Sequence, residues 1–255
     1  MKALITGASS GIGYEMAKYL DKLGIDLILV ARREDRLVKL KKELHVNVKI
    51  ITMDLSIKNN ANRLYDRCKN EGINILINNA GFGLFGDFTL TSLEKEMEMI
   101  DLNVITPHIL TKLFLKDFIK KNEGYILNVC SSAGFMAGPK LNTYYATKNY
   151  LLKLTMAINE EIRRSKKNVK ISALCPGPVN TEFNDVAKGS FTIKGIKSDY
   201  VAKLAIDKMF KGKMIIIPTF KMKLAIFATR FMPYRWQLKT NYNIQNAKIN
   251  NKKEN

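Results

Sequence analysis

Short apolar runs alternate with longer amphipathic segments along the first 220 residues of the chain. The runs are rich in isoleucine, leucine and valine, as expected for strands buried on both faces of a parallel sheet. We expect these strands at Ala3–Thr6, Leu27–Val30, Val48–Met53, Ile73–Ile77, Tyr125–Cys130, Val169–Leu174 and Met214–Ile217. Between them, apolar residues recur with helical spacing. Helices are expected at Gly11–Leu23, Glu34–Leu44, Lys58–Asn70, Ser92–Asp101, Val104–Lys121, Asn142–Arg164 and Ser198–Phe210.

This alternation of strands and helices is typical of βαβ units. It predicts a single α/β domain over residues 1–220, a Rossmann-type, doubly wound parallel sheet of about seven strands with helices on both faces. Residues 221–255 form a basic, partly apolar C-terminal extension. The last part of this extension, 241–255, is polar and is expected to fray.

The composition is that of an ordinary globular protein, with 46% hydrophobic and 25% charged residues in a chain of 255. Its three cysteines show no C-x-x-C spacing and only two histidines are present. We therefore expect no metal site, no disulfide framework and a reducing compartment. We also expect no signal peptide and no membrane-spanning helix, and hence a cytoplasmic protein, because the first strand leads directly into glycines and no long apolar run occurs.

A glycine-rich loop, T-G-A-S-S-G-I-G at Thr6–Gly13, follows the first expected strand. Gly7 lets the backbone turn, Gly11 permits the close approach of a pyrophosphate, and Gly13 lets the helix pack on the strand. The phosphates would lie on the amide groups and the positive end of the following helix. Because the loop joins a strand to a helix, it predicts dinucleotide binding rather than a plain tight turn.

The end of the second strand indicates which dinucleotide is preferred. NAD sites usually carry an acid there for the ribose 2′-hydroxyl, whereas an arginine accommodates a 2′-phosphate. Here Arg32 and Arg33 follow the strand, and the first acid is Glu34. We predict NADP(H) in preference to NAD(H); the alternative is that the arginines merely open a solvated helix. Asp54 and Leu55, after the third strand, are expected to flank the adenine.

A candidate catalytic set begins at Ser131, which follows the fifth expected strand. Tyr144 and Lys148 are four residues apart and so share one face of the next expected helix. A nearby ammonium favours the phenolate and lowers the pKa of a tyrosine, which suits a general acid for carbonyl reduction. The neighbouring Tyr145 has no lysine four positions on, so we assign it no role.

With these motifs the chain resembles the short-chain dehydrogenase/reductase family over about Lys2–Ile217, in its NADP-preferring branch. The motifs are T-G-x-x-x-G-I-G, Asn78-Asn79-Ala80-Gly81, Asp101-Leu102-Asn103-Val104, Ser131, the Y-x-x-x-K of Tyr144 and Lys148, and Pro176–Thr181. The resemblance implies a seven-stranded Rossmann-type sheet. It also implies hydride transfer with a nicotinamide, which interconverts a ketone or aldehyde and an alcohol.

The resemblance further implies a role for each matching residue. Tyr144 would be the catalytic acid/base, and Ser131 would hydrogen-bond the substrate carbonyl. Lys148 would hold the nicotinamide ribose and lower the tyrosine pKa, and Asn103 would order a water in the proton relay. The residues implied in cofactor binding are Gly7, Ser9, Ser10, Gly11, Ile12, Arg32, Arg33, Asp54, Leu55, Asn79, Ala80, Tyr144, Lys148, Pro176, Gly177, Val179 and Thr181.

The substrate loop is expected at Glu182–Lys197, with the apolar residues Phe183, Val186, Phe191, Ile193 and Ile196. They favour an apolar or bulky substrate, unless they only pack the loop onto the body. After Gly81 and at Ile217–Thr219 the sequence departs from the acyl-carrier-protein-dependent 3-oxoacyl reductases and is closer to broad-specificity and hydroxysteroid-type members. A catalytically idle NADP(H)-binding sensor is the alternative function, disfavoured because the whole catalytic set is present. The resemblance also implies a homodimer or homotetramer.

Basic residues gather toward the C-terminus: the chain has a formal net charge of +19, and ten basic residues stand against one acid from Lys211 onward. No nucleic-acid-binding motif accompanies them, so no nucleic-acid partner is expected. Cations interleaved with large apolar residues at Lys221–Trp236 can form a helix on an anionic membrane, although Pro233 would interrupt it. We favour the alternative that this segment packs over the substrate cleft or a subunit interface.

Overall fold

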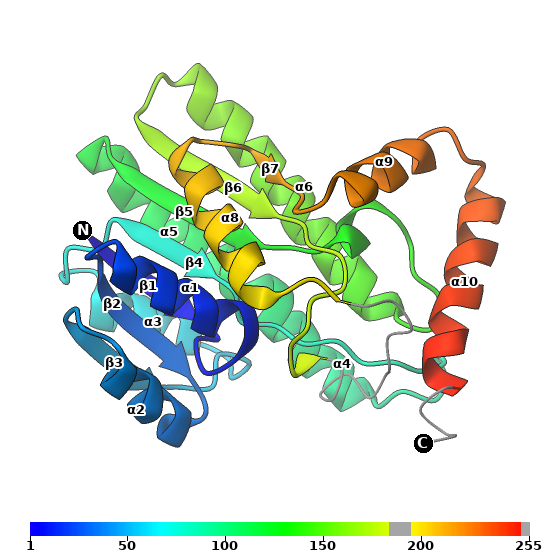
Figure 1. The fold of residues 1–255 in the computed structure, drawn as a ribbon, viewed down its shortest axis with the longest axis horizontal. Helices are drawn as coiled ribbons and strands as arrows, with labels where there is room; N and C mark the ends of the chain where they lie inside the picture. Colours follow the sequence, from blue (N-terminus) through cyan, green and yellow to red (C-terminus); the bar gives the residue numbers. More distant parts are fainter. Residues whose placement is uncertain (184–194, 251–255) are drawn as a thin grey trace.

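The computed structural model describes residues 1–183 and 195–250, and side chains as far as residue 247. Its centre is a seven-stranded sheet in the order β3-β2-β1-β4-β5-β6-β7, in which every pairing is parallel (Figure 1). The strands are β1 (Lys2–Thr6), β2 (Asp26–Ala31), β3 (Val48–Thr52), β4 (Ile75–Asn78), β5 (Gly124–Val129), β6 (Val169–Leu174) and β7 (Ile215–Ile216). The predicted doubly wound α/β fold is therefore confirmed.

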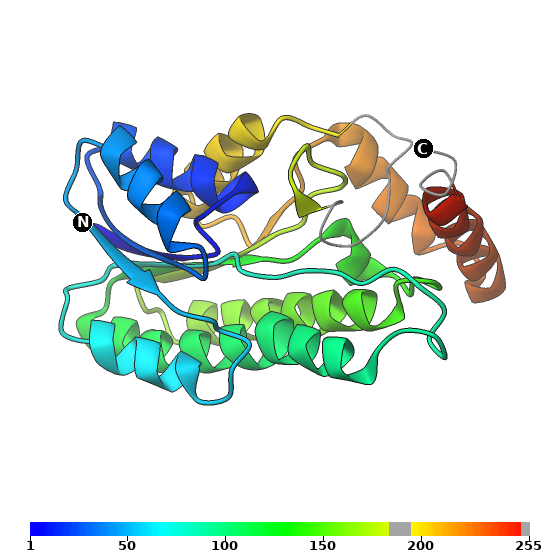
Figure 2. The ribbon, with the colours of Figure 1, turned by 90° about the horizontal axis from the view of Figure 1, so that it is seen from below.

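Helices cover both faces of the sheet (Figure 2). One layer consists of α1 (Gly11–Lys22), α2 (Glu34–Glu43) and α8 (Ser198–Phe210), and the other of α3 (Asn60–Cys68), α5 (Thr106–Lys121) and α6 (Asn142–Arg164). Successive residues of a strand point to opposite faces. Accordingly Ala3 and Ile5 of β1 belong to the core under the first layer, and Leu4 to the core under the second.

Strand β1 lies between β2 and β4, so the order of the strands reverses at this point. In open α/β sheets the loops diverge at such a switch point and leave a crevice at the carboxyl ends of the strands, where ligands bind. The glycine-rich loop follows β1 and Asn79 follows β4. The topology thus brings two motifs that are about 70 residues apart to one crevice.

The segment before α5 differs in detail from the two expected helices. Helix α4 (Leu93–Ile100) and α5 are joined by a π-helical turn at Asp101–Ile105. π-Helical turns are frequently found at functional sites. Asn103, one of the expected catalytic residues, lies in this turn and is almost completely buried.

Two helices form the C-terminal extension, at the end of the molecule away from the N-terminus (Figures 1 and 2). Helix α9 (Phe220–Thr229) begins after Thr219, whose hydroxyl accepts a hydrogen bond from the backbone N–H of Met222. Helix α10 (Tyr234–Asn250) begins directly after Pro233. The predicted interruption at this proline is therefore present.

The expectation that 241–255 frays is wrong for residues 241–250, which continue α10. The cause is tertiary. Asn241 Nδ2 donates to the carbonyl oxygen of Ala137 at 2.8 Å, and Gln245 Nε2 donates to Tyr145 Oη at 2.7 Å. These contacts bury both amide side chains against the body of the domain. Residues 251–255 lie outside the described part of the chain.

Candidate active site

A cavity of about 370 Å³ opens at the carboxyl ends of the strands. Asn103 does not line it, but every other residue that the sequence placed in the catalytic or cofactor site does. These lining residues are Gly7, Ser9, Ser10, Gly11, Ile12, Arg32, Arg33, Asp54, Leu55, Asn79, Ala80, Ser131, Tyr144, Lys148, Pro176, Gly177, Val179 and Thr181. The fold therefore gathers residues from the whole length of the domain around one space.

The glycine-rich loop has the geometry that a pyrophosphate requires. Gly7 and Gly11 have φ angles of 69° and 59°, in the left-handed region that favours glycine. Asn79 Nδ2 donates to the carbonyl oxygens of Thr6 and Gly7, each at 3.0 Å, and braces the loop from β4. A Cβ on Gly13 would lie 2.4 Å from the same nitrogen, so helix, loop and Asn79 pack without room for a side chain.

The amino end of α1 faces this loop. Its N-cap residue, Ser10, makes no side-chain capping bond, and no acid stands in the first turn of the helix. The first N–H groups and the positive end of the helix dipole are thus left for an anion. The loop and α1 therefore fit the phosphates of a dinucleotide.

Arg33 lies beside the loop. Its guanidinium donates to Ser10 Oγ at 2.9 Å and pairs with Glu182 Oε2 at 3.0 Å. Arg36 also pairs with Glu182, and the two guanidinium groups hold the pKa of this carboxyl below its usual value. Arg32 is more exposed and makes longer contacts, 3.7 Å to Asp54 and 3.5 Å to Glu98.

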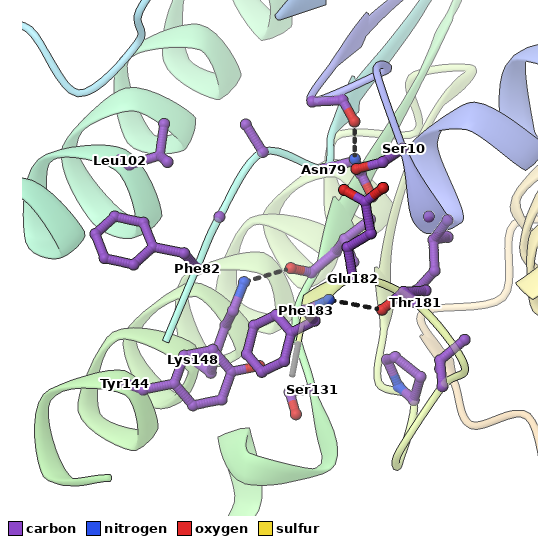
Figure 3. Close-up of a pocket in the computed structure, with 18 of the residues that line it drawn as sticks. Ser10, Asn79, Phe82, Leu102, Ser131, Tyr144, Lys148, Thr181, Glu182 and Phe183 are labelled. Atoms are coloured by element: carbon purple, nitrogen blue, oxygen red, sulfur yellow. Dashed lines mark hydrogen bonds between the residues drawn. The ribbon is translucent and has the colours of Figure 1, made fainter. Parts of the chain in front are cut away.

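Tyr144, Lys148 and Ser131 lie together at one end of the cavity, apart from Ser10 and Asn79 (Figure 3). Tyr144 and Lys148 come from α6, and Lys148 Nζ lies 5.8 Å from the centre of the tyrosine ring. Ser131 caps a short 3₁₀ helix (Ser132–Phe135) after β5 and lines the cavity beside Tyr144. The predicted helix and its shared face are as expected.

The pKa of Tyr144 differs from the expectation. Burial raises this pKa above its usual value, and the nearby Ser131 hydroxyl opposes the rise without overcoming it. Lys148 Nζ donates to the carbonyl oxygen of Val129 at 2.9 Å and lies 5.8 Å from the centre of the Tyr144 ring. Burial lowers the pKa of Lys148 itself. Because its pKa is raised, the Tyr144 phenol stays protonated at neutral pH and can donate a proton.

Asn103 lies next to the candidate catalytic residues and does not line the cavity. Its Nδ2 donates to the carbonyl oxygen of Phe82 at 2.9 Å and its Oδ1 accepts from the N–H of Phe82 at 3.1 Å. A further bond of 3.2 Å reaches Thr147 Oγ1 on α6. The side chain thus ties the segment after β4 to α6, and a Cβ on Gly81 would lie only 2.8 Å from its Oδ1.

Several residues around the cavity carry no signal in the sequence. Tyr145, to which we assigned no role, lines the cavity and accepts a hydrogen bond from Gln245, which lines it from α10. Burial raises the pKa of Tyr145 to about 12 despite this bond. Glu182 opens the expected substrate loop, and nothing in its spacing indicates a partner in Arg33.

Apolar side chains form the wall next to Tyr144. The ring of Phe183 packs against that of Tyr144 with the centroids 5.4 Å apart, and Phe82 and Leu141 also line the cavity. Of the other loop residues, Ile196 pairs through its backbone with Val179. The remaining apolar loop residues named from the sequence, Val186, Phe191 and Ile193, lie outside the described residues.

Comparison with known proteins defines the class. Residues 1–189 match the family model described as short chain dehydrogenase. An uncharacterized oxidoreductase of Staphylococcus epidermidis is 32% identical over 186 residues, which cover 72% of this chain and 80% of the relative. The chain belongs to the short-chain dehydrogenase family, and it is an oxidoreductase.

Solved structures resemble the chain over most of its length. A short-chain dehydrogenase from Sphingobium yanoikuyae in complex with NADPH has a TM-score of 0.81 and 29% identity, covering 90% of this chain and 93% of that one. The bulky-bulky ketone specific alcohol dehydrogenase from Comamonas testosteroni has a TM-score of 0.77 and 27% identity, with 90% and 91% covered. Both similarities extend beyond the residues matched by the family model.

Proposed function

We propose that this protein is an NADP(H)-dependent oxidoreductase that interconverts a ketone or aldehyde and an alcohol, with an apolar or bulky substrate. One observation carries the proposal: Ser131, Tyr144 and Lys148 meet at one end of a cavity that also includes the glycine-rich loop. A hydrogen-bonding serine and a protonated phenol beside an apolar wall can polarise and protonate a carbonyl oxygen.

The cofactor would lie along the cavity, held by residues that fit its parts. Its phosphates would lie on the loop Gly7–Ile12 and the amino end of α1, and its adenine near Asp54 and Leu55. Asn79 and Ala80 would line the adenosine side, and Pro176, Gly177, Val179 and Thr181 would line the nicotinamide side. When bound, the nicotinamide supplies or accepts the hydride.

The preference for NADP(H) rests on charge at the end of β2. Arg32 and Arg33 line the cavity there, where a ribose 2′-phosphate would lie, and the contacts of Arg32 with Asp54 and Glu98 are as long as 3.7 and 3.5 Å. The similar short-chain dehydrogenase from Sphingobium yanoikuyae forms a complex with NADPH, which supports the same choice.

The chain's own residues would carry the proton and position the substrate. Ser131 and Tyr144 would hold the carbonyl oxygen, and the Tyr144 phenol would donate the proton to it as it becomes an alcohol. Lys148 would hold the nicotinamide ribose from its place next to Val129. Asn103 would order the water of the proton relay, beside the Phe82 backbone that it clamps.

The apolar wall of Phe82, Leu141 and Phe183 supports an apolar or bulky substrate. The similarity to the bulky-bulky ketone specific alcohol dehydrogenase of Comamonas testosteroni points the same way. We further infer that two or four copies assemble through α5 and α6, each of which presents an exposed face.

The test is NADPH and NADH oxidation against a panel of ketones, aldehydes and steroid carbonyls, with wild type and Tyr144→Phe. We expect turnover with NADPH that falls by about a hundredfold or more in Tyr144→Phe, because the proton donor is lost. The matched control is Tyr200→Phe, at an exposed position of α8 outside the cavity, which should keep its turnover. Unchanged turnover in Tyr144→Phe would refute the assignment, and NADPH binding with no turnover on any carbonyl would favour the sensor.

A further inference from the structure

Helix α9 carries an apolar stripe on its outer side that no other described part of the chain covers. Phe220, Leu224 and Phe227 are spaced i, i+4 and i+7, and Phe231 continues the series just beyond the helix. The rings of Phe227 and Phe231 pack edge to face with the centroids 5.3 Å apart. These four side chains, the outer stripe, are between 54% and 78% exposed.

The outer stripe is not the face that attaches α9 to the domain. That role belongs to the opposite side, where Ile226 is buried and Met222 packs closely on Gly177. Gln237 of α10 donates to the carbonyl oxygens of Thr229 and Met232 and fixes the turn between the two helices. Helix α9 is thus attached to the domain by one apolar side and exposes a second apolar side, the outer stripe, to solvent.

Cations flank the outer stripe on both sides. At about 100° per residue, Lys221 falls on one side of it and Lys223 and Arg230 on the other. All three are exposed, and no acid occurs anywhere between Asp207 and Glu254. Among the described residues, no ion pair involves a cation of α9 or α10.

The first residues of α10 also combine exposed aromatic side chains with cations. Tyr234 and Trp236 are each at least 67% exposed, and Arg235 and Lys239 are exposed beside them. Amphipathic aromatic rings are favoured at the boundary between lipid and water, and cations are attracted to anionic headgroups. The surface of 220–239 thus has both of the components that bind a helix in the plane of a membrane.

We propose that residues 220–239 form a peripheral docking surface for an anionic lipid bilayer, with the outer stripe in the headgroup region and the flanking cations on the lipid phosphates. Charge complementarity selects this occupant. A second copy docked through the same surface would bring two all-cationic faces together, which costs free energy. No helix of the described chain is long and apolar enough to cross the bilayer.

The proposal has a consequence for the cavity, and this part rests on the proposed function. Helix α10 begins within the docking surface and supplies Gln245 to the cavity wall. An enzyme bound to lipid through 220–239 would therefore hold its cavity near the membrane, where an apolar substrate dissolves.

The experiment is co-sedimentation of the full chain, without substrate or cofactor, with vesicles of phosphatidylcholine alone or with phosphatidylglycerol added. We expect binding that requires phosphatidylglycerol. Lys221→Gln/Lys223→Gln should lower the partition coefficient about thirtyfold, because each cation near an anionic surface contributes about 1 kcal/mol. The matched control, Lys39→Gln/Lys42→Gln, removes the same charge from exposed positions of α2 and should bind like wild type.

A second pair tests the apolar part. Leu224→Ser/Phe227→Ser should also reduce binding, whereas Phe88→Ser/Leu90→Ser, which removes a similarly exposed pair elsewhere, should not. Circular dichroism checks that each variant is folded, and the lysine pair leaves all packed side chains intact. The proposal is overturned by equal binding of wild type and the lysine variant, or by binding that ignores phosphatidylglycerol. It is also overturned if Leu224→Ser/Phe227→Ser instead halves the particle mass in solution, which would make the stripe a subunit interface.

Discussion

Arg33 contacts the glycine-rich loop on one side and Glu182, in the segment after β6, on the other. The bond of 2.9 Å to Ser10 Oγ places its guanidinium where the phosphates of a dinucleotide would lie, and the pair with Glu182 orients it. A charged hydrogen bond in such a position contributes more than a neutral one. Arg33 is therefore the residue on which a preference for a 2′-phosphate should depend most.

We predict that Arg33→Ala weakens NADPH binding by about tenfold or more and NADH binding much less, because only NADPH loses a charge-assisted contact. Dissociation constants from cofactor fluorescence test this. Arg36→Ala is the control, since it removes the same charge and also pairs with Glu182 but does not line the cavity. An equal loss for both dinucleotides would show that Arg33 supports the loop instead of the 2′-phosphate.

Helix α10 links the extension to the cavity. It begins after Pro233, contacts the segment after β5 through Asn241, and reaches Tyr145 through Gln245. This last contact is 2.7 Å long and buried, and it joins two residues that line the cavity, so it fixes that part of the cavity wall.

We predict that Gln245→Ala raises KM for a carbonyl substrate roughly fivefold, because the buried hydrogen bond to Tyr145 is lost, and leaves NADPH affinity unchanged. Steady-state kinetics and NADPH titration measure the two quantities. Asn243→Ala, on the exposed side of the same helix, is the control and should change neither. A lower melting temperature with an unaltered KM would mean that Gln245 only stabilises the helix.

A separate hydrophobic core covers each face of the sheet, and both cores adjoin the cavity at the carboxyl ends of the strands. Motifs from β1, β2, β4, β5, β6 and α6 surround the cavity, so a bound dinucleotide would bridge elements from both halves of the sheet. A ligand that binds the folded state and not the unfolded one raises the free energy of unfolding. Cofactor binding should therefore be measurable as an increase in the free energy of unfolding of the whole domain.

We predict that NADPH at a hundred times its dissociation constant raises the free energy of unfolding by about 2.7 kcal/mol. For a chain of this size that corresponds to a rise in melting temperature of roughly 5–10 °C. The same concentration of NADH should give a smaller rise. Thermal unfolding followed by circular dichroism tests this independently of any substrate, and equal shifts with the two cofactors would contradict the predicted preference.

The fold and most of the cavity lining could be predicted from the chain because their signals are local. Strand and helix periods depend on neighbouring residues, and the predicted helix Asn142–Arg164 matches α6 residue for residue. The spacing of Tyr144 and Lys148 likewise places them on one face of a helix. Because the sheet is parallel, the carboxyl ends of its strands all lie on the same side, and the motif residues that follow the strands meet there.

Contacts between segments that are distant in the sequence could not be predicted from local patterns. Tyr145 and Gln245 are 100 residues apart, and Arg33 and Glu182 are 149 apart, so neither pair leaves a periodic pattern. The pKa of Tyr144 also depended on the surroundings, because burial of the phenol raises it and the Lys148 nitrogen donates to the carbonyl oxygen of Val129. Local periodicity and motif order were thus sufficient for the family, the sheet and the positions of the candidate catalytic side chains. The protonation of Tyr144, the partner of Arg33 and the place of the C-terminal helices were decided by packing, since burial and long-range hydrogen bonds exist only once the chain has folded.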